Sequence, residues 1–234
     1  MRTPISMTLL LALAMPVSAQ QWIPDARTAG SGAASAFTMM PPGWHVTTQT
    51  EGGVLYDTSY TAAGRFAVEA EIFIFPGASE EGYGVFAGGK DLESGARSFI
   101  AFLARTDGST GVFRFSGTNA PEPLVDWTSG SAVLPAGSEA QRNTLRVTAE
   151  PDTVRFHANG TEVAKLARAQ LTLDGLFGLR VGAGLNLHAA NLDLTRRLAP
   201  VPTRSDPPHP PRGNVPIAAP AQPSRTAEPL RAAS

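Results

Sequence analysis

Residues 143–166, NTLRVTAEPDTVRFHANGTEVAKL, constrain the fold more than any other part of this sequence. Asn159-Gly160 predicts a tight hairpin turn, because both central residues of a type I′ turn need positive φ angles. Pro151-Asp152 predicts a second turn, since proline presets the first central position of a type I turn. We therefore expect three short antiparallel strands joined by two tight turns.

Pairing outward from these turns predicts the register of the three strands. It sets four pairs opposite each other: Val147 and Phe156, Ala149 and Val154, Phe156 and Val163, His157 and Glu162. Because side chains alternate along a strand, one face is apolar and carries Leu145, Val147, Ala149, Val154, Phe156 and Val163. The other face is polar and carries Arg146, Thr148, Arg155, His157 and Glu162. This pattern predicts an antiparallel sheet with one buried and one wet face, centred on Phe156.

Short strand patterns continue along most of the chain, and helical patterns are almost absent. A possible edge strand at residues 37–40 precedes an expected hairpin at residues 44–58. Further strands are predicted at residues 65–75, 82–90, 98–105, 111–116, 123–127, 131–134, 176–182 and 186–195. Many short strands with regularly spaced turns predict an all-β, two-sheet antiparallel sandwich. We assign it to residues 38–197.

Three segments resemble the concanavalin A-like jelly-roll domains, the laminin-G and legume-lectin architecture. They are the meander above, FAVEAEIFIF followed by GYGVFAGG, and GLFGLRVGAGLNLHAANLDL. The similarity extends over roughly residues 44–194 and is strongest to bacterial secreted domains of the 3-keto-disaccharide hydrolase type. It implies a jelly-roll fold, and a carbohydrate as the partner.

The two ends of the chain have compositions unlike the centre. Residues 1–19 have the regions of a secretory signal peptide: Arg2, an apolar run, and the small-residue cleavage site Val17-Ser18-Ala19. The chain has no cysteine, so neither disulfides nor thiolate metal sites are possible. We predict export to a bacterial periplasm or the extracellular space, without membrane insertion after cleavage.

Residues 20–37 are predicted to be a flexible lead-in, and residues 198–234 a disordered, Pro-rich tail. The tail holds no Phe, Tyr or Trp, so it cannot bury enough apolar surface to offset the entropy of ordering. An extension without a partner is the first interpretation, and weak attachment to an anionic envelope polymer, suggested by its mildly basic charge, is the alternative. The net charge of −1 and the lack of a basic patch argue against nucleic acid as a partner.

Asp126 and Trp127 form the first candidate binding site, because an aromatic ring and a carboxylate together suit a sugar's apolar face and hydroxyls. A loop position for this pair is expected, and a Trp127 that plugs the end of the sandwich is the alternative. Tyr83 lies among glycines, where a ligand could approach closely. Arg114 and Arg180 lie on apolar strands, where they could bind carboxylates or hydroxyls or simply face water.

No residue pattern establishes catalysis or a metal site. Glu69 and Glu71 share one strand face at a spacing that glycosidases use. Glucanases of the resembled architecture carry Glu-x-Asp-x-x-Glu, and the third carboxylate is missing here. His45, His157, His188 and His209 lack the spacing of zinc ligands, and no Asp-rich loop supports a calcium site, so no cofactor is predicted.

The sequence therefore favours an exported carbohydrate-binding domain that is non-catalytic or weakly catalytic. Two alternatives stay open: a glycoside-processing hydrolase similar to the 3-keto-disaccharide hydrolases, and a structural module of the cell envelope that contacts another protein.

Overall fold

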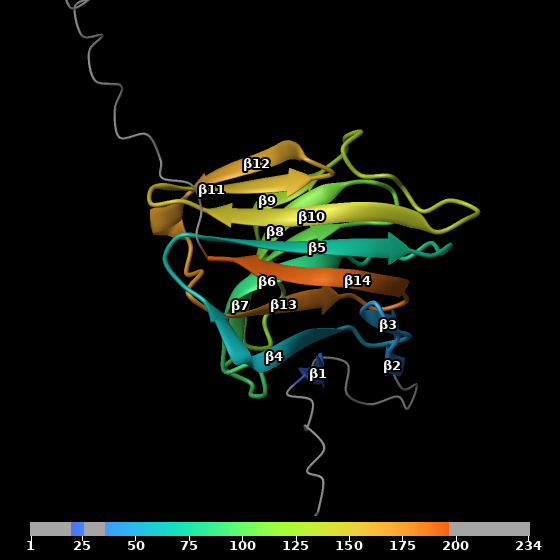
Figure 1. The fold of residues 1–234 in the computed structure, drawn as a ribbon, viewed down its shortest axis with the longest axis horizontal. Helices are drawn as coiled ribbons and strands as arrows, with labels where there is room; N and C mark the ends of the chain where they lie inside the picture. The colour runs from blue at the N-terminus through green and yellow to red at the C-terminus, as the bar shows by residue number, and fades with distance from the viewer. Residues whose placement is uncertain (1–19, 26–35, 197–234) are drawn as a thin grey trace, which may run out of the picture. The chain divides into compact units, whose positions relative to one another are not determined.

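The computed structural model describes residues 20–25 and 36–196, and two antiparallel sheets of seven strands each form the domain (Figure 1). The first sheet contains, in spatial order, β1 (Gln20–Pro24), β4 (Gly53–Ala62), β13 (Gly175–Val181), β6 (Tyr83–Lys90), β7 (Ser98–Ala104), β8 (Thr110–Ser116) and β9 (Glu122–Thr128). The second contains β12 (Thr161–Ala167), β11 (Thr153–Ala158), β10 (Gln141–Ala149), β5 (Phe66–Ile74), β14 (Asn186–Thr195), β3 (Trp44–Thr47) and β2 (Ala36–Met39). The predicted signal peptide and Pro-rich tail lie outside the described residues.

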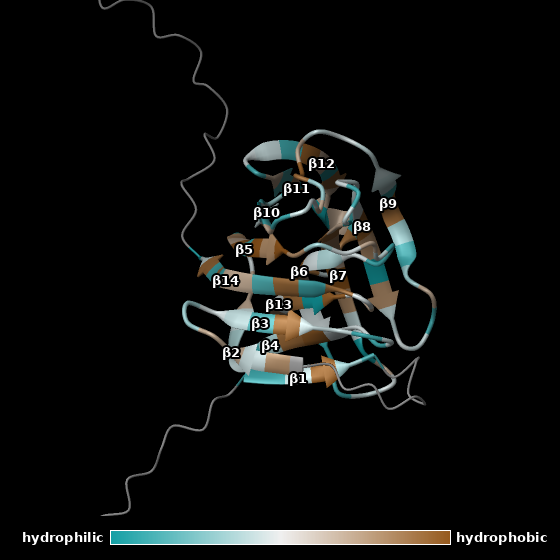
Figure 2. Ribbon diagram, turned by 90° about the vertical axis from the view of Figure 1, so that its right-hand side faces the viewer, coloured by the Kyte–Doolittle hydropathy of each residue, from teal (hydrophilic) through white to brown (hydrophobic). Residues whose placement is uncertain are grey.

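The main hydrophobic core lies between the two sheets. Figure 2 shows the ribbon of the sheets turned by 90° from Figure 1. Phe156 of the second sheet is fully buried, and its ring lies 5.5 Å from that of Phe102 of the first sheet, centroid to centroid. Val68, Val85 and Leu179 are among the other core residues with at most 1% exposure. The predicted two-sheet β-sandwich, with Phe156 at the centre of a buried face, is confirmed.

The predicted meander corresponds to β10, β11 and β12. Val147 pairs with Phe156, Ala149 with Val154 and His157 with Glu162, as the two turns predict. Phe156, however, lies opposite Ala164 and not Val163, because a register shift between Phe156 and His157 adds one residue to β12. A bulge of this kind leaves one residue out of the alternation. Val163 still packs against the main core but is only partly buried.

Several predicted elements differ from those in the structure. Residues 44–58 do not form a hairpin, since β3 belongs to the second sheet and β4 to the first. The lead-in contains an ordered strand, β1, which pairs with β4. Residues 131–134 form no strand, and a short 3-10 helix, η2 (Arg168–Gln170), follows β12. In the described ranges no helix is long and apolar enough to cross a membrane.

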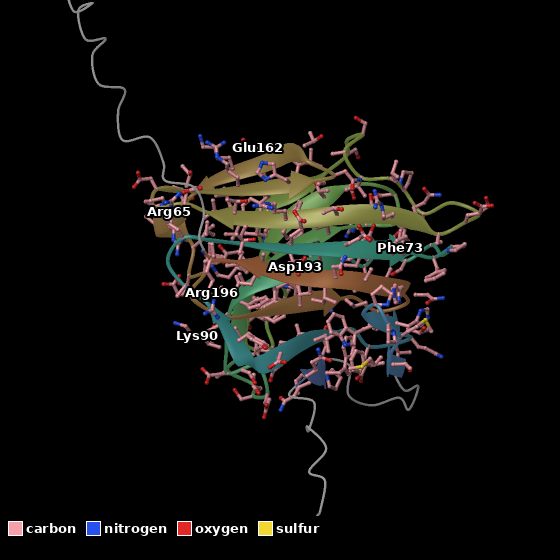
Figure 3. All side chains as sticks on the ribbon, in the orientation of Figure 1. Arg65, Phe73, Lys90, Glu162, Asp193 and Arg196 are labelled. Carbon is pink, nitrogen blue, oxygen red and sulfur yellow. The ribbon has the colours of Figure 1, made fainter. Side chains whose placement is uncertain are left out.

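The outer face of the second sheet is polar, as the alternation along its strands predicts. Figure 3 looks onto this sheet and labels Glu162, Phe73 and Asp193. Glu69 pairs with Arg146 and Glu71 with Arg142, each at 3.2 Å, and both carboxylates are partly exposed. The two glutamates considered as a glycosidase pair are thus members of surface ion pairs, which contribute little to stability.

The outer face of the first sheet is apolar and carries a second hydrophobic cluster. It contains Val54, Tyr56, Phe86, Leu92, Phe99, Ala101, Leu103, Phe113 and Phe115. The rings of Phe99 and Phe115 stack at a centroid distance of 4.5 Å. Ile23, Trp127 and Leu176 pack against the same cluster and are only partly buried. Strands β6, β7 and β8 are therefore apolar on both faces, which is unusual for a sheet whose outer side faces water.

Candidate functional site

A pocket of about 370 Å³ opens beside this second cluster, on the outer face of the first sheet. Leu103, Phe113 and Phe115 give it an apolar floor, and each of them is less than 8% exposed. Charged residues surround the floor: Asp25, Glu80, Glu81, Arg105 and Arg180. Pockets of this size with an apolar lining and a few polar groups are the usual form of a small-molecule site.

Trp127 forms one wall of the pocket, and a bulge in edge strand β9 directs it there. Thr110 pairs with Thr128 and Val112 with Val125, so Asp126 and Trp127 together face the single residue Gly111. Bulges of this kind bend a strand and change the direction of a side chain. The indole then lies 4.8 Å from the Phe113 ring, measured between centroids.

Gly82 makes room for this indole just before β6. A Cβ atom on Gly82 would lie 2.7 Å from Cη2 of Trp127 and 3.0 Å from Cβ of Leu103, which is closer than side chains tolerate. Glycine in or beside a strand often marks such a close approach. Among the interpretations open for this Gly-rich segment, Gly82 accommodates a protein side chain.

Arg105 follows β7 and covers the Trp127 ring. Its Cζ atom lies 3.9 Å from the ring centroid, which is a close cation–π contact. Its Nε atom is buried, and the described residues offer it no hydrogen-bond partner. Nearby Asp107 instead accepts hydrogen bonds from the hydroxyl and backbone N–H of Ser109, which lower the pKa of its carboxyl group.

Asp25 forms the opposite wall, where it binds two arginines from distant segments. One carboxylate oxygen accepts a hydrogen bond from Arg97 at 2.7 Å and the other from Arg180 at 2.5 Å. All three side chains are less than 8% exposed. Arg180 also donates to the backbone carbonyl oxygens of Gly53 and Val181, so its main role is to hold β13, β4 and the end of β1 together.

The backbone arrangement matches solved structures of known proteins. Carbohydrate-binding module CBM66 from Bacillus subtilis is 14% identical, with a TM-score of 0.54 over 74% of this chain and 94% of that one. The metal-free carbohydrate recognition domain of Emp46p is 11% identical, with a TM-score of 0.55 over 76% of this chain and 89% of that one. The exoplasmic domain of VIP36, bound to Ca²⁺ and mannose, is 9% identical, with a TM-score of 0.54 over 77% of this chain and 85% of that one.

The chain has the concanavalin A-like jelly-roll fold. The resemblance proposed from the sequence is thereby confirmed at the level of fold. No model of a protein family matches the sequence, and no curated protein matches it either. The jelly roll itself supports many functions, so the function has to be argued from the pocket.

The jelly roll brings together only two of the five residues predicted for the site. Trp127 and Arg180 both line the pocket. Asp126 is exposed beside it, and its carboxylate accepts a hydrogen bond from the Trp127 backbone N–H at 2.8 Å. The pair lies within β9 and not on a loop, which corrects the predicted position.

Tyr83 and Arg114 lie elsewhere in the domain. Tyr83 is fully buried between the sheets, where burial raises the pKa of its hydroxyl and Asn143 donates a hydrogen bond to it. A ligand cannot reach it there, which corrects the prediction that Tyr83 contacts one. Arg114 forms a partly exposed ion pair with Glu122 at 2.7 Å and donates to the carbonyl of Gln170, away from the pocket.

The pocket also contains residues that were not predicted from the sequence: Asp25, Arg105, Phe113 and Phe115. Alternation along residues 98–105 places Arg105 on the same face as Phe99 and Leu103. The position of Arg105 on this face could therefore have been predicted from the sequence. Asp25 lies in a segment that looks like a linker, and nothing local connects it to Arg97 or Arg180. Within residues 20–25 and 36–196, no cluster of three or more His, Asp or Glu side chains could hold a metal ion.

Proposed function

We propose that this protein is an exported carbohydrate-binding domain and that the pocket on the outer face of the first sheet is its binding site. The observation that carries the proposal is an aromatic floor, made by Phe113 and Phe115, surrounded by charged side chains. Sugars present apolar C–H faces, which pack on aromatic rings, and hydroxyl groups, which hydrogen-bond to carboxylates and guanidinium groups.

The solved structures with this fold support the proposal by analogy. CBM66 is a carbohydrate-binding module, the Emp46p domain is a carbohydrate recognition domain, and the VIP36 domain was solved with bound mannose. At this sequence identity the likeness extends to the fold alone, so the pocket's own chemistry carries the greater weight.

The arrangement of the carboxylates favours binding without bond cleavage. Glu69 and Glu71 lie on the outer face of the other sheet, in ion pairs with Arg146 and Arg142. In the pocket, both oxygens of Asp25 accept hydrogen bonds from arginines, which leaves it poorly suited to proton transfer. Turnover of a 3-keto-glucoside by the purified protein would contradict this part of the proposal.

Export remains part of the proposal, together with the periplasm or the extracellular space as the location. It rests on the signal-peptide pattern of residues 1–19 and on the absence of cysteine. Cleavage after Ala19 would leave the mature chain beginning at Gln20, the first residue of β1, so that processing preserves the whole strand. The Pro-rich residues 198–234 would then extend from the domain as a tether, free to contact an anionic envelope polymer.

A glycan array with the purified protein, followed by calorimetric titration of the glycans bound, tests the proposed function. Trp127→Ala removes one pocket wall and is expected to weaken binding by about 1–3 kcal/mol, the usual loss for an aromatic residue at the centre of an interface. Tyr60→Ala is the control, since Tyr60 is 55% exposed and does not line the pocket. No binding to any glycan, or equal losses in both variants, would contradict the proposal.

A further inference from the structure

Arg105 is a pocket cation without an ion-pair partner within 4 Å among the described residues, although the charge of Asp107 lies near enough to interact with it. No carboxylate oxygen of a described residue lies within 4 Å of its guanidinium nitrogens, although nine other ion pairs at that distance are present. Its buried Nε–H has no acceptor in the described part of the chain. A guanidinium group has five N–H donors, and a buried donor without an acceptor is unfavourable.

Trp127 holds this guanidinium in position and is itself partly covered by it. With Cζ at 3.9 Å from the ring centroid, Arg105 occupies one face of the indole, and Phe113 packs on the ring at 4.8 Å. Arg105 and Phe113 thus cover part of the indole surface. The structure thus assigns Trp127 a positioning role, and Arg105 is the group that contacts the ligand.

The other charged groups of the pocket differ from Arg105 in their exposure or their partners. Arg180 is bound to Asp25, and Asp25 is in turn bound to Arg97, so the charges of these three groups are paired with one another. Glu80 and Glu81 are exposed at the mouth of the pocket. Their segment runs beside Arg105, because Tyr83 pairs with Ala104 and Thr106 donates a hydrogen bond to the Ser79 carbonyl at 2.7 Å. They therefore weaken the attraction of the pocket for an anion, and Arg105 has to outweigh them.

We propose that the pocket selects an acidic saccharide, one whose sugar ring carries a carboxylate, and that Arg105 binds this carboxylate. The planar fork of a guanidinium group matches a carboxylate with two parallel N–H···O bonds, and such charge-assisted bonds are the strongest that the pocket can make. The sugar ring then packs over Phe113 and Phe115. This inference rests on the proposed carbohydrate-binding function and specifies its substrate class.

Titration calorimetry with paired ligands tests the inference. Each pair consists of an acidic oligosaccharide (oligogalacturonate, oligoglucuronate or oligomannuronate) and the same oligosaccharide with its carboxylates chemically reduced to alcohols. The full-length protein is expected to bind at least one acidic member about tenfold or more tightly than its reduced partner, as a charge-assisted hydrogen bond implies. Sulfated oligosaccharides form a separate arm, and a preference for them over all carboxylated ligands overturns the assignment of a carboxylate.

Substitutions at Arg105 test whether this residue causes the preference for the acidic ligand. Arg105→Gln is expected to abolish the preference for the acidic member over its reduced partner, and Arg105→Lys is expected to keep part of it. Arg114→Gln is the matched control, because it removes an arginine outside the pocket and should leave both affinities unchanged. The double variant Glu80→Gln/Glu81→Gln is expected to bind the acidic ligand more tightly than the wild-type protein.

The outcomes separate this inference from the proposed function. Equal affinity for acidic and reduced ligands, or a preference that survives Arg105→Gln, would overturn acid selectivity and leave carbohydrate binding in place. No binding to either member of any pair, and none on the glycan array, would overturn both. Weaker binding of the acidic ligand alone at higher NaCl concentration supports the ion pair, because salt screens it.

Discussion

At the scale of single residues, Gly82 sets the position of the Trp127 indole. A methyl group here would lie 2.7 Å from Cη2 of Trp127, with Leu103 blocking the other side. Gly82→Ala is expected to displace the indole, and with it Arg105. We expect severalfold weaker saccharide binding in calorimetry and a loss of about 1–3 kcal/mol of unfolding free energy in urea, as for other overpacked sites.

Gly130→Ala is the matched control for this prediction. Gly130 follows β9, and a Cβ atom there would meet nothing within 4 Å. Both its affinity and its stability should therefore equal those of the wild-type protein. Unchanged affinity in Gly82→Ala would show that the position of the indole does not matter for binding.

His157 links the stability of the domain to pH. Burial lowers the pKa of its imidazole, Arg146 and Arg155 lower it further, and Glu162 opposes them. The unfolded chain therefore takes up this proton more readily than the folded one, and the stability from neutral His157 is present above the unfolded pKa of about 6.5. That stability is lost as the pH falls from there toward the lower pKa of the folded state.

Urea unfolding at about pH 7.5 and about pH 5.5, on either side of the unfolded pKa, measures this effect. The wild-type protein is expected to lose more unfolding free energy between the two pH values than His157→Gln does. Apart from Glu162, which lies 4.0 Å from His157, the carboxylates titrate alike in both proteins, so the difference reports on the histidine and this one neighbour. An equal loss in the two proteins would show that His157 does not respond to pH as its burial implies.

Residue patterns in the sequence predicted which strand faces are buried and which are polar, but they predicted few of the residues in the pocket. Alternation correctly placed Phe156 in the core and Glu69 on a polar face. Tyr83 was misassigned because neighbouring glycines suggest an accessible backbone, whereas here they let strands and side chains pack closely over it. Arg105 was not predicted because its place in the pocket depends on its contact with Trp127. Trp127 is distant in sequence, and a bulge in β9 directs its side chain toward Arg105.

At the scale of elements, Asp25 fixes the end of β1 to the loop before β7 and to β13. Its carboxylate is bound to both Arg97 and Arg180, and all three side chains are less than 8% exposed. Asp25→Asn would leave two buried guanidinium groups without their anion. We expect a loss of about 3–5 kcal/mol in unfolding free energy, the usual effect of removing one partner from a buried ion pair.

Glu122→Gln is the control for the buried ion pair. It breaks the exposed pair with Arg114 and is expected to change the unfolding free energy by less than about 1 kcal/mol. Urea unfolding of the two variants side by side measures the contrast. A loss in Asp25→Asn no larger than that in Glu122→Gln would mean that Asp25 does not hold β1 in place.

The elements themselves could be predicted largely from local patterns, but their assignment to sheets could not. Turn residues and alternation located β10, β11 and β14, and three of the four cross-strand pairs predicted for the meander are correct. The chain between β3 and β4 looks like a hairpin, yet it crosses from one sheet to the other. The sheet that each of the two strands joins depends on which other strands are available to pair with it. Those partners, β14 for β3 and β13 for β4, are distant in sequence.

At the scale of the whole molecule, the sandwich is expected to fold without the Pro-rich tail. Residues 200–234 contain no Phe, Tyr or Trp and hold ten of the chain's prolines, so they offer little that could pack. Truncation after Arg197 should leave one cooperative thermal transition with an unchanged Tm. A Tm lowered by more than about 3 °C, or roughly 1 kcal/mol for a domain of this size, would show that the tail docks on it.

The central claim is that a saccharide binds in the pocket on the outer face of the first sheet. Backbone and indole N–H chemical shifts of the ¹⁵N-labelled protein, followed as the best-binding oligosaccharide is added, test it most directly. The account predicts that the Trp127 indole and the amides of Gly82, Arg105 and Phe113 shift, while that of Arg146 on the second sheet does not. Shifts that cluster around Arg146 and leave Trp127 and Arg105 unmoved would place the binding site on the other face and contradict the account.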